Sequence, residues 1–289
     1  MTTESARALH PDDAEYPVRL KDLARVAPDP LYALGDAPWP DVPLVAIVGA
    51  RAATRYGRAA AARIAARCAA AGVGVVSGLA LGIDGAAHRA ALARGGWTIA
   101  VLGGGLDRVY PPEHASLYTA IARAGRVLSP WHAGAMPMPF RFPARNRVLA
   151  ALGDVTVVVQ ADAQSGSRHT VRAALALGRI VRVVPWPLEH PAYAGNAAWM
   201  RERRAAVLAS ADEPARLAAE AWAARRRAAE PADDRARVEQ ALAAGPRTLD
   251  ALARTAGLAI AAAARAATAL EIAGRIERTG GDRYRRRPH

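Results

Sequence analysis

Residues 44–51 of this 289-residue chain read LVAIVGAR, five apolar residues followed by glycine, alanine and arginine. A continuous apolar run of this length that ends in glycine is typical of a strand buried on both faces of a parallel sheet. Similar apolar runs follow at residues 73–76, 97–102, 126–129, 155–160 and 180–184. Strands that alternate with helices of about 10–15 residues predict an α/β fold, with a mostly parallel sheet covered on both faces.

The stretches between these strands have helical composition, and most of them end at a glycine, which favours helix termination. We expect helices at residues 57–71, 84–94, 113–124, 144–152 and 168–177. Beyond Pro185 the chain becomes more irregular, with further helices expected at 197–205 and 214–229. Residues 42–229 are therefore predicted to form one domain.

The segments on either side of this domain differ from it. Residues 1–41 contain several prolines and are expected to form a lead-in with little regular structure beyond a short helix near 18–26. Residues 230–233 read EPAD and are the predicted linker. Residues 234–287 contain three short helical stretches followed by a β-hairpin, an order typical of a small winged-helix domain.

Composition excludes several classes of protein. The single cysteine, Cys68, can form neither an intramolecular disulfide nor a cysteine-based zinc site. Residues 1–17 are polar and acidic, so no signal peptide is expected, and no uncharged apolar run reaches the ~18 residues of a membrane helix. The sequence therefore predicts a cytoplasmic protein without membrane insertion.

The formal net charge of +13 comes almost entirely from the predicted sheet domain. Residues 42–188 contain 17 arginines and five acidic residues, a balance of +12. Three stretches in this range have no acidic residue, namely 42–83, 114–153 and 163–188. Arginines scattered over solvated helix faces would explain this balance, and so would one positive surface assembled from several loops. The second alternative predicts an anionic polymer as partner.

The loops that follow the predicted strands favour one positive surface. Ligands of parallel α/β sheets bind beyond the carboxyl ends of the strands, and four of the five candidate loops there overlap the acid-free stretches. Glycines allow a ligand to approach the backbone, arginines suit phosphates, and aromatics beside arginines are typical of single-strand binding. The candidate contacts are Gly49, Arg51, Ser77, Gly78, Gly103, Gly104, Phe140, Arg141, Phe142, Arg145, Asn146, Arg147, Ser165 and Gly166.

Structural roles remain alternatives for several of these residues. Glycine turns after strands also occur for packing alone, and some residues of 140–147 would serve equally as helix-surface arginines or core phenylalanines. Asp84 is expected to stabilise its loop or the start of a helix rather than to catalyse. His88 and Cys68 are expected to be structural. No nucleophile–base pair, metal-ligand spacing, dinucleotide fingerprint or Walker motif is present, so we expect neither an enzyme nor a cofactor.

In these loops the chain resembles the DprA/Smf family (DNA-processing protein A). The matching segments are VGAR (48–51), SGLALGIDGAAH (77–88), TIAVLGGGLDRVYP (98–111), FPARNRVLAALGD (142–154) and, in part, SGSRHT (165–170). The resemblance implies an extended Rossmann-like domain, often followed by a winged helix. It also implies a recombination mediator that binds single-stranded DNA, forms a homodimer through the Rossmann-like domain, protects incoming DNA and helps load RecA recombinase in natural transformation.

The chain departs from the family pattern at Pro130, near Gln160, at Arg168 and at Trp186. Two other functions stay open. The glycine loops would suit a nucleotide-binding sensor or nucleotide hydrolase, although the Pro-Gly-Gly-x-Gly-Thr-x-x-Glu motif of such hydrolases is missing. A transcription regulator would read DNA with its winged helix, but the candidate recognition helix at 260–273 offers only Arg265. We therefore expect an auxiliary or protein-contact role for that domain.

Overall fold

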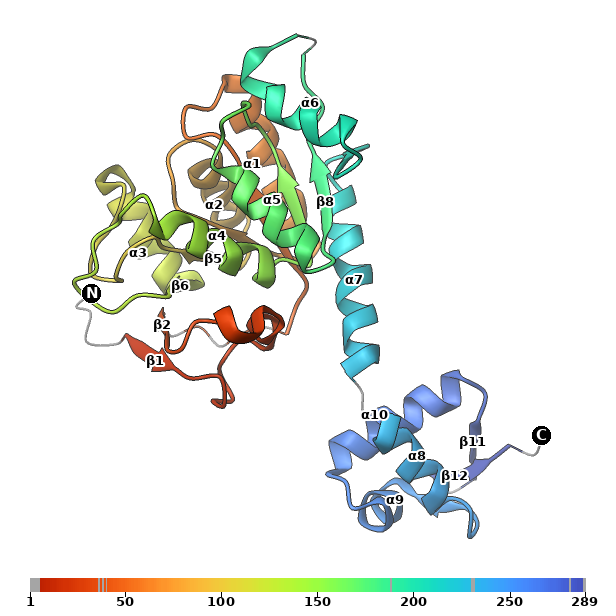
Figure 1. Ribbon diagram of the computed structural model, residues 1–289. Helices are drawn as coiled ribbons and strands as arrows, with labels where there is room; N and C mark the ends of the chain where they lie inside the picture. Colours follow the sequence, from red (N-terminus) through yellow and green to blue (C-terminus); the bar gives the residue numbers. More distant parts are fainter. Residues whose placement is uncertain are drawn as a thin grey trace. The chain divides into compact units, whose positions relative to one another are not determined.

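The computed structural model describes residues 6–35, 37, 39, 41–187, 189–229, 232–280 and 282–287. The chain divides into two compact units, Met1–Trp222 and Ala223–His289, and each has its own apolar core (Figure 1). Glu230 and Pro231 of the predicted linker lie outside the described residues, as do residues 1–5 of the predicted lead-in.

In the described part of the first unit, nine strands form one sheet in the order β1-β2-β6-β5-β4-β3-β7-β8-β9. The strands are β1 (Arg7–Leu9), β2 (Leu31–Leu34), β3 (Leu44–Val48), β4 (Gly74–Ser77), β5 (Thr98–Val101), β6 (Arg126–Ser129), β7 (Val155–Val158), β8 (Ile180–Val183) and β9 (Ala206–Val207). The strands from β6 to β9 in this order pair in parallel, whereas β1 and β2 add antiparallel pairs at one edge. The predicted fold class, α/β with a mostly parallel sheet, is confirmed.

Helices cover both faces of the sheet (Figure 1). One face carries α1 (Arg55–Ala70), α2 (Ile83–Ala93) and α3 (Ala115–Ala124), and the other carries α4 (Arg141–Leu152) and α5 (Ser167–Ala176). Alternate residues of a strand point to opposite faces, so Val45 and Ile47 pack with α1 and α2, and Val48 packs with α4. The chain continues through η3 (Pro112–His114), η4 (Pro191–Tyr193), α6 (Ala194–Arg201) and α7 (Glu213–Ala229).

The order of the strands reverses next to β3. From β3 the chain adds β4, β5 and β6 in turn on one side, and then returns to place β7 on the other side of β3. The loops that leave two such strands diverge toward opposite faces of the sheet and leave a crevice at the carboxyl ends, which is the usual ligand site of open α/β sheets. The residues after β3 and β7 therefore border one crevice.

The N-terminal segment is more ordered than the sequence predicts. The helix expected near 18–26 is present as the 3-10 helix η2 (Val18–Val26). The expectation of little other regular structure is wrong, because β1 and β2 extend the sheet from β6. Residues 32–34 pair with residues 127–129, so this edge of the sheet depends on a pairing between segments far apart in the sequence.

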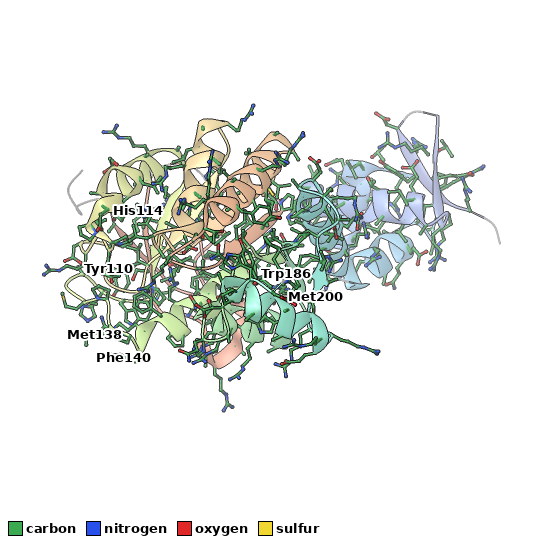
Figure 2. All side chains as sticks on the ribbon, turned by 90° about the horizontal axis from the view of Figure 1, so that it is seen from above. Tyr110, His114, Met138, Phe140, Trp186 and Met200 are labelled. Atoms are coloured by element: carbon green, nitrogen blue, oxygen red, sulfur yellow. The ribbon has the colours of Figure 1, made fainter. Side chains whose placement is uncertain are left out.

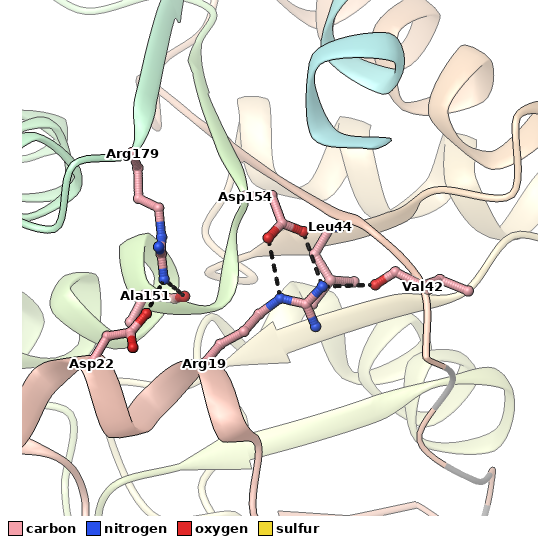
Figure 3. Close-up of polar contacts among 7 residues, drawn as sticks. All are labelled: Arg19, Asp22, Val42, Leu44, Ala151, Asp154 and Arg179. Carbon is pink, nitrogen blue, oxygen red and sulfur yellow. Dashed lines mark hydrogen bonds and ion pairs between the residues drawn. The ribbon is translucent and has the colours of Figure 1, made fainter. Parts of the chain in front are cut away.

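Two arginine–aspartate pairs hold η2 against the end of the sheet opposite the crevice (Figure 3). Arg19 Nη2 donates to Asp154 Oδ2 at 3.0 Å and to the carbonyl oxygen of Val42 at 2.9 Å. The same carboxylate accepts from the backbone nitrogen of Leu44 at 2.8 Å, at the start of β3. Arg179 Nη2 donates to Asp22 Oδ2 at 2.6 Å. Asp154 thereby ties the N-terminal segment to the central strand.

The second unit folds as the predicted winged helix. It contains α8 (Ala232–Ala241), β10 (Arg247–Thr248), α9 (Leu249–Ala256), α10 (Ile260–Ile272), β11 (Ile276–Thr279) and β12 (Arg283–Arg286), and the strands form an antiparallel sheet in the order β10-β12-β11. The Thr248 hydroxyl accepts from the backbone nitrogen of Ala251 and caps α9, which ends at Gly257 with φ 65°. Among the described residues, no single helix is long and apolar enough to cross a bilayer; α9 and α10, bent by 106°, meet that criterion only as a pair.

Candidate nucleic-acid interface

Two adjoining hollows lie at the carboxyl edge of the sheet, and Ala80, Arg51, Phe142 and Arg145 line both of them. The larger hollow, of about 410 Å³, opens at the crevice between β3 and β7. The smaller one, of about 70 Å³, reaches toward the loops after β4 and β5. Most of the predicted contact residues line one or both hollows: Gly49, Arg51, Gly78, Gly103, Phe142, Arg145, Asn146, Ser165 and Gly166.

The loop that carries Arg51 is clamped between two neighbours. The backbone nitrogen of Ala50 donates to the carbonyl oxygen of Gln160 at 2.8 Å, and Ala50 in turn accepts from Ile83 N at 3.2 Å. Gly82 adopts φ +76° at the start of α2, and a side chain there would collide with the carbonyl groups of residues 50 and 51. With its backbone held in this way, Arg51 points an exposed side chain to solvent at the crevice.

The guanidinium of Arg51 lies over an aromatic ring. Its carbon Cζ is 4.8 Å from the centre of the Phe142 ring, within the range of a cation–π contact. Gly103 leaves room for this ring, because a Cβ atom at that position would be 2.7 Å from Phe142 Cε1. Within the described residues, no carboxylate lies at salt-bridge distance from Arg51. The arginine thus offers a positive charge beside an aromatic wall.

Arg145 approaches the same ring from the interior. Its Cζ lies 5.6 Å from the centre of the Phe142 ring, and only 5% of the residue is exposed. Nη1 donates to the carbonyl oxygens of Gly78 at 2.6 Å and Val101 at 2.7 Å, and Nε donates to Asn146 Oδ1 at 3.0 Å. Burial lowers the pKa of Arg145 to about 10, so it stays charged at neutral pH. It joins the ends of β4 and β5 to α4 and positions the floor of both hollows.

Asp84 organises the loop between β4 and α2. Its Oδ2 accepts from the backbone nitrogens of Gly78 at 3.1 Å and Ala80 at 3.3 Å, and the residue is buried. Burial raises the pKa of this carboxyl, and the nearby charge of Arg145 opposes that rise. The expectation that Asp84 stabilises its loop is confirmed. Cys68 is likewise buried in the core between the sheet and α1, as expected.

His88, one turn further along α2, is fully buried. Its Nδ1 lies 2.8 Å from the hydroxyl of Thr98, which itself donates to the carbonyl oxygen of Val75. The hydroxyl therefore accepts from Nδ1, and no partner for Nε2 is found among the described residues. Burial, followed by the charges of His114, Arg89 and Arg145, lowers the pKa of His88 to about 3. His88 is a structural histidine that stays neutral.

This histidine predicts an acid-sensitive fold. Since its pKa is depressed from 6.5 to about 3, the stability it contributes is present above pH 6.5 and is lost as pH falls toward 3. The loss reaches about 2 kcal/mol near pH 5. Urea unfolding of wild type and His88→Gln, followed by tryptophan fluorescence between about pH 7 and pH 5, measures it. We expect a smaller pH dependence in the variant, and an equal one would contradict this assignment.

The start of α5 forms the other wall of the larger hollow. The backbone nitrogens of Arg168 and His169 donate to the carbonyl oxygens of Ser165 and Gly166, so these amides are already used within the turn. In contrast, Thr170 Oγ1 is buried without a partner among the described residues, and Thr170 lines the hollow. Thr170 is thus a lining residue whose hydroxyl has no partner among the described residues, and sequence reasoning missed it because one threonine in a helix carries no signal.

Gln160 and Asp162 follow β7 and complete the crevice. Gln160 Oε1 accepts from both the backbone nitrogen and the hydroxyl of Thr54, each at 2.9 Å, and so helps to start α1. Asp162 Oδ1 accepts from the backbone nitrogen of Gln164 at 2.9 Å. Neither residue was expected as a lining residue, because the apolar run gives no sign of where β7 ends.

The other predicted contacts lie outside both hollows. Ser77 is fully buried and its hydroxyl donates to the carbonyl oxygen of Ile47. Gly104 lies under the backbone of residues 135–137. Phe140 and Arg147 are exposed at and beyond the start of α4, and Arg141 Nη1 donates to Met136 O. Whether these residues contact a ligand stays a prediction.

Comparison with known proteins agrees with this architecture. The family described as DNA recombination-mediator protein A matches residues 7–218, and the DprA winged helix domain matches residues 223–282. The putative DNA processing protein DprA of Mycobacterium tuberculosis is 44% identical over 202 residues, which are 65% of this chain and 52% of that protein. This chain thus spans about half the length of that relative.

Two solved structures share the fold. The DNA processing protein A of Streptococcus pneumoniae aligns with a TM-score of 0.67 and 35% identity over 72% of each chain. The protein from Helicobacter pylori, whose structure is described for its unique single-stranded DNA binding mode, aligns with a TM-score of 0.65 and 31% identity over 72% of this chain and 93% of that one. With a family match that covers residues 7–218, this chain belongs to the DNA recombination-mediator protein A family.

Proposed function

We propose that this chain binds single-stranded DNA at the carboxyl edge of its sheet and acts as a recombination mediator. The observation that carries the proposal is the exposed Arg51, which lies 4.8 Å from the Phe142 ring at the crevice between β3 and β7. A guanidinium without a carboxylate partner can bind a phosphate. Bases stack on aromatic rings and on guanidinium planes, so the pair can hold both parts of a nucleotide.

The shape of the hollows favours unpaired bases. An unpaired base can enter a hollow and offer its face and its hydrogen-bonding edge, whereas a paired base offers only its groove edges. The larger hollow provides an apolar wall at Phe142 and Leu149, and its polar lining includes Asn146 and Ser165. These groups suit the face and edge of one base.

The charge of the domain supports a polyanion. Residues 42–188 carry a balance of +12, which attracts a phosphate backbone over a distance of about one Debye length. Two carboxylates line the larger hollow, but Asp84 is engaged by the amides of Gly78 and Ala80, and Asp162 by the amide of Gln164. The positive charge of Arg51 is left for the ligand.

The remaining parts of the proposal rest on family membership. The H. pylori relative is described as a single-stranded DNA binder, and this supports the same ligand here. We further propose that the chain protects incoming DNA, helps load RecA recombinase on it in natural transformation, forms a homodimer through its Rossmann-like unit, acts in the cytoplasm and is not an enzyme. The winged helix would contribute protein contacts or weak duplex binding.

A binding comparison tests the ligand class. Fluorescent oligo-dT and a matched duplex are titrated with the full chain at two salt concentrations, and a mononucleotide is then added as competitor. We expect tighter binding of the single strand, and affinity that falls as salt rises. Equal binding of the duplex would contradict the proposal. Competition by a mononucleotide at micromolar concentration would instead support a nucleotide sensor.

A further inference from the structure

Large apolar side chains are exposed beside the smaller hollow. Tyr110 is 45% exposed, Met136 54%, Met138 43% and Phe140 70%. They come from the loop after β5 and the loop between β6 and α4, and we call these four residues the apolar track. In Figure 2, Tyr110, Met138 and Phe140 lie in one region of the first unit, apart from Trp186 and Met200. Exposed apolar surface of this kind marks an interaction site.

Backbone contacts hold the two loops together. The backbone nitrogen of Gly105 donates to the carbonyl oxygen of Ala135 at 2.8 Å, and that of Gly134 donates to Asp107 Oδ1 at 2.8 Å. A side chain at Gly104 would lie 2.8 Å from Ala135 O, so the loops touch there. The backbone of the two loops is therefore held in place before any partner arrives, which lowers the entropic cost of binding.

The track continues from the candidate site. Tyr110 lines the smaller hollow with Arg51, and its ring centre is 6.4 Å from that of Phe142. At the other end, the guanidinium of Arg141 lies 5.7 Å from the ring centres of both Phe140 and Trp131. Arg141 places a positive charge among the apolar side chains of the track.

We propose that the apolar track binds the nucleotides that flank those in the hollows on the same single strand. This inference rests on the proposed function and adds a second subsite to it. Residues 114–153 contain no acidic residue, and Arg141, beside Phe140, supplies a positive charge that suits a phosphate backbone. The nearby Asp107 is engaged by Arg108 at 3.3 Å and by the amide of Gly134. Aromatic and thioether groups stack on any base, so the track extends the contact without sequence preference.

The test separates the subsites by oligonucleotide length. Anisotropy titrations of the full chain use oligo-dT of about 4 and about 16 nucleotides. We expect the double variant Met138→Ala/Phe140→Ala to bind the short oligonucleotide as wild type does and the long one at least about fivefold more weakly. Phe140→Trp should retain the long-oligonucleotide affinity, because it keeps an aromatic face. Val18→Ala/Val26→Ala removes two other exposed apolar side chains, away from the track, and should change neither affinity.

Several outcomes would overturn the inference. The inference fails if the double variant binds the long oligonucleotide as tightly as wild type does, or if it loses affinity equally for the short and the long oligonucleotide. It also fails if the valine control loses affinity for the long oligonucleotide to a similar extent, or if wild type binds the long oligonucleotide no more tightly than the short one. Arg51→Ala run in parallel tests the proposed function separately, because it should weaken the short oligonucleotide as well. If Arg51→Ala leaves both affinities unchanged while the double variant weakens the long oligonucleotide, the assignment of the hollows as the binding site fails. The difference between the two oligonucleotide lengths in the double variant still tests the track.

Discussion

Replacing Arg51 with alanine is expected to weaken the binding of oligo-dT by about tenfold to hundredfold at low salt. Hydrogen bonds to a charged group contribute about 1.5–3 kcal/mol, and Arg51 has no carboxylate partner among the described residues to share that interaction. Loss of one phosphate contact should also reduce the slope of log affinity against log salt by about 0.7. Anisotropy titrations at several salt concentrations measure both effects.

Two further variants make this result specific. Arg94 is an exposed arginine at the C-terminal end of α2, at the opposite end of that helix from the crevice, so Arg94→Ala removes the same charge and should change affinity little. Arg51→Lys keeps the charge but loses the planar group over Phe142, and should bind with intermediate affinity. If Arg94→Ala and Arg51→Ala weaken binding equally, general charge rather than this site holds the strand.

Replacing Asp154 with alanine is expected to lower the free energy of unfolding of the first unit by about 3–5 kcal/mol. The carboxylate is fully buried and accepts from Leu44 N and Arg19 Nη2, and the Arg19 side chain is only 12% exposed. Removing one member of a buried pair leaves an uncompensated charge and an unpaired amide. All six tryptophans lie in the first unit, so tryptophan fluorescence during urea unfolding follows this unit.

An exposed pair provides the matched control. Glu220 pairs with Arg216 one turn away on α7, and both side chains are about 60% exposed. Glu220→Ala should therefore cost less than about 0.5 kcal/mol. Asp154→Asn should fall between the two variants, because it keeps an acceptor for Leu44 N. If Asp154→Ala is no more destabilising than Glu220→Ala, Asp154 does not anchor the N-terminal segment.

The central strands could be predicted because their signal is local. A strand buried on both faces needs a run of apolar residues, and LVAIV at 44–48 meets that need within five positions. The strands β1 and β2 were missed because they are short and exist through pairing with β6. Nothing local in residues 31–34 indicates a partner so distant in the sequence.

The candidate site likewise combines residues whose role could be predicted from the sequence with residues whose role could not. Arg51 could be predicted because it directly follows an unmistakable strand. The environments of Phe140, Phe142 and Arg145 could not, since they depend on where α4 begins and on carbonyl groups supplied by β4 and β5. Sequence alone predicted both Arg145 and Arg51 as ligand contacts, whereas the structure surrounds Arg145 with backbone acceptors. Phe142 lies inside the site and Phe140 stands exposed beside it.

Photochemical crosslinking tests most directly where the strand binds. An oligo-dT in which bromodeoxyuridine replaces some thymidines is irradiated in complex with the full chain, and the crosslinked peptides are identified by mass spectrometry. A strand bound at the carboxyl edge of the sheet predicts crosslinks within 49–52, 103–111 and 140–147, which Arg51→Ala should reduce. Crosslinks confined to the winged helix at 232–287 would contradict it.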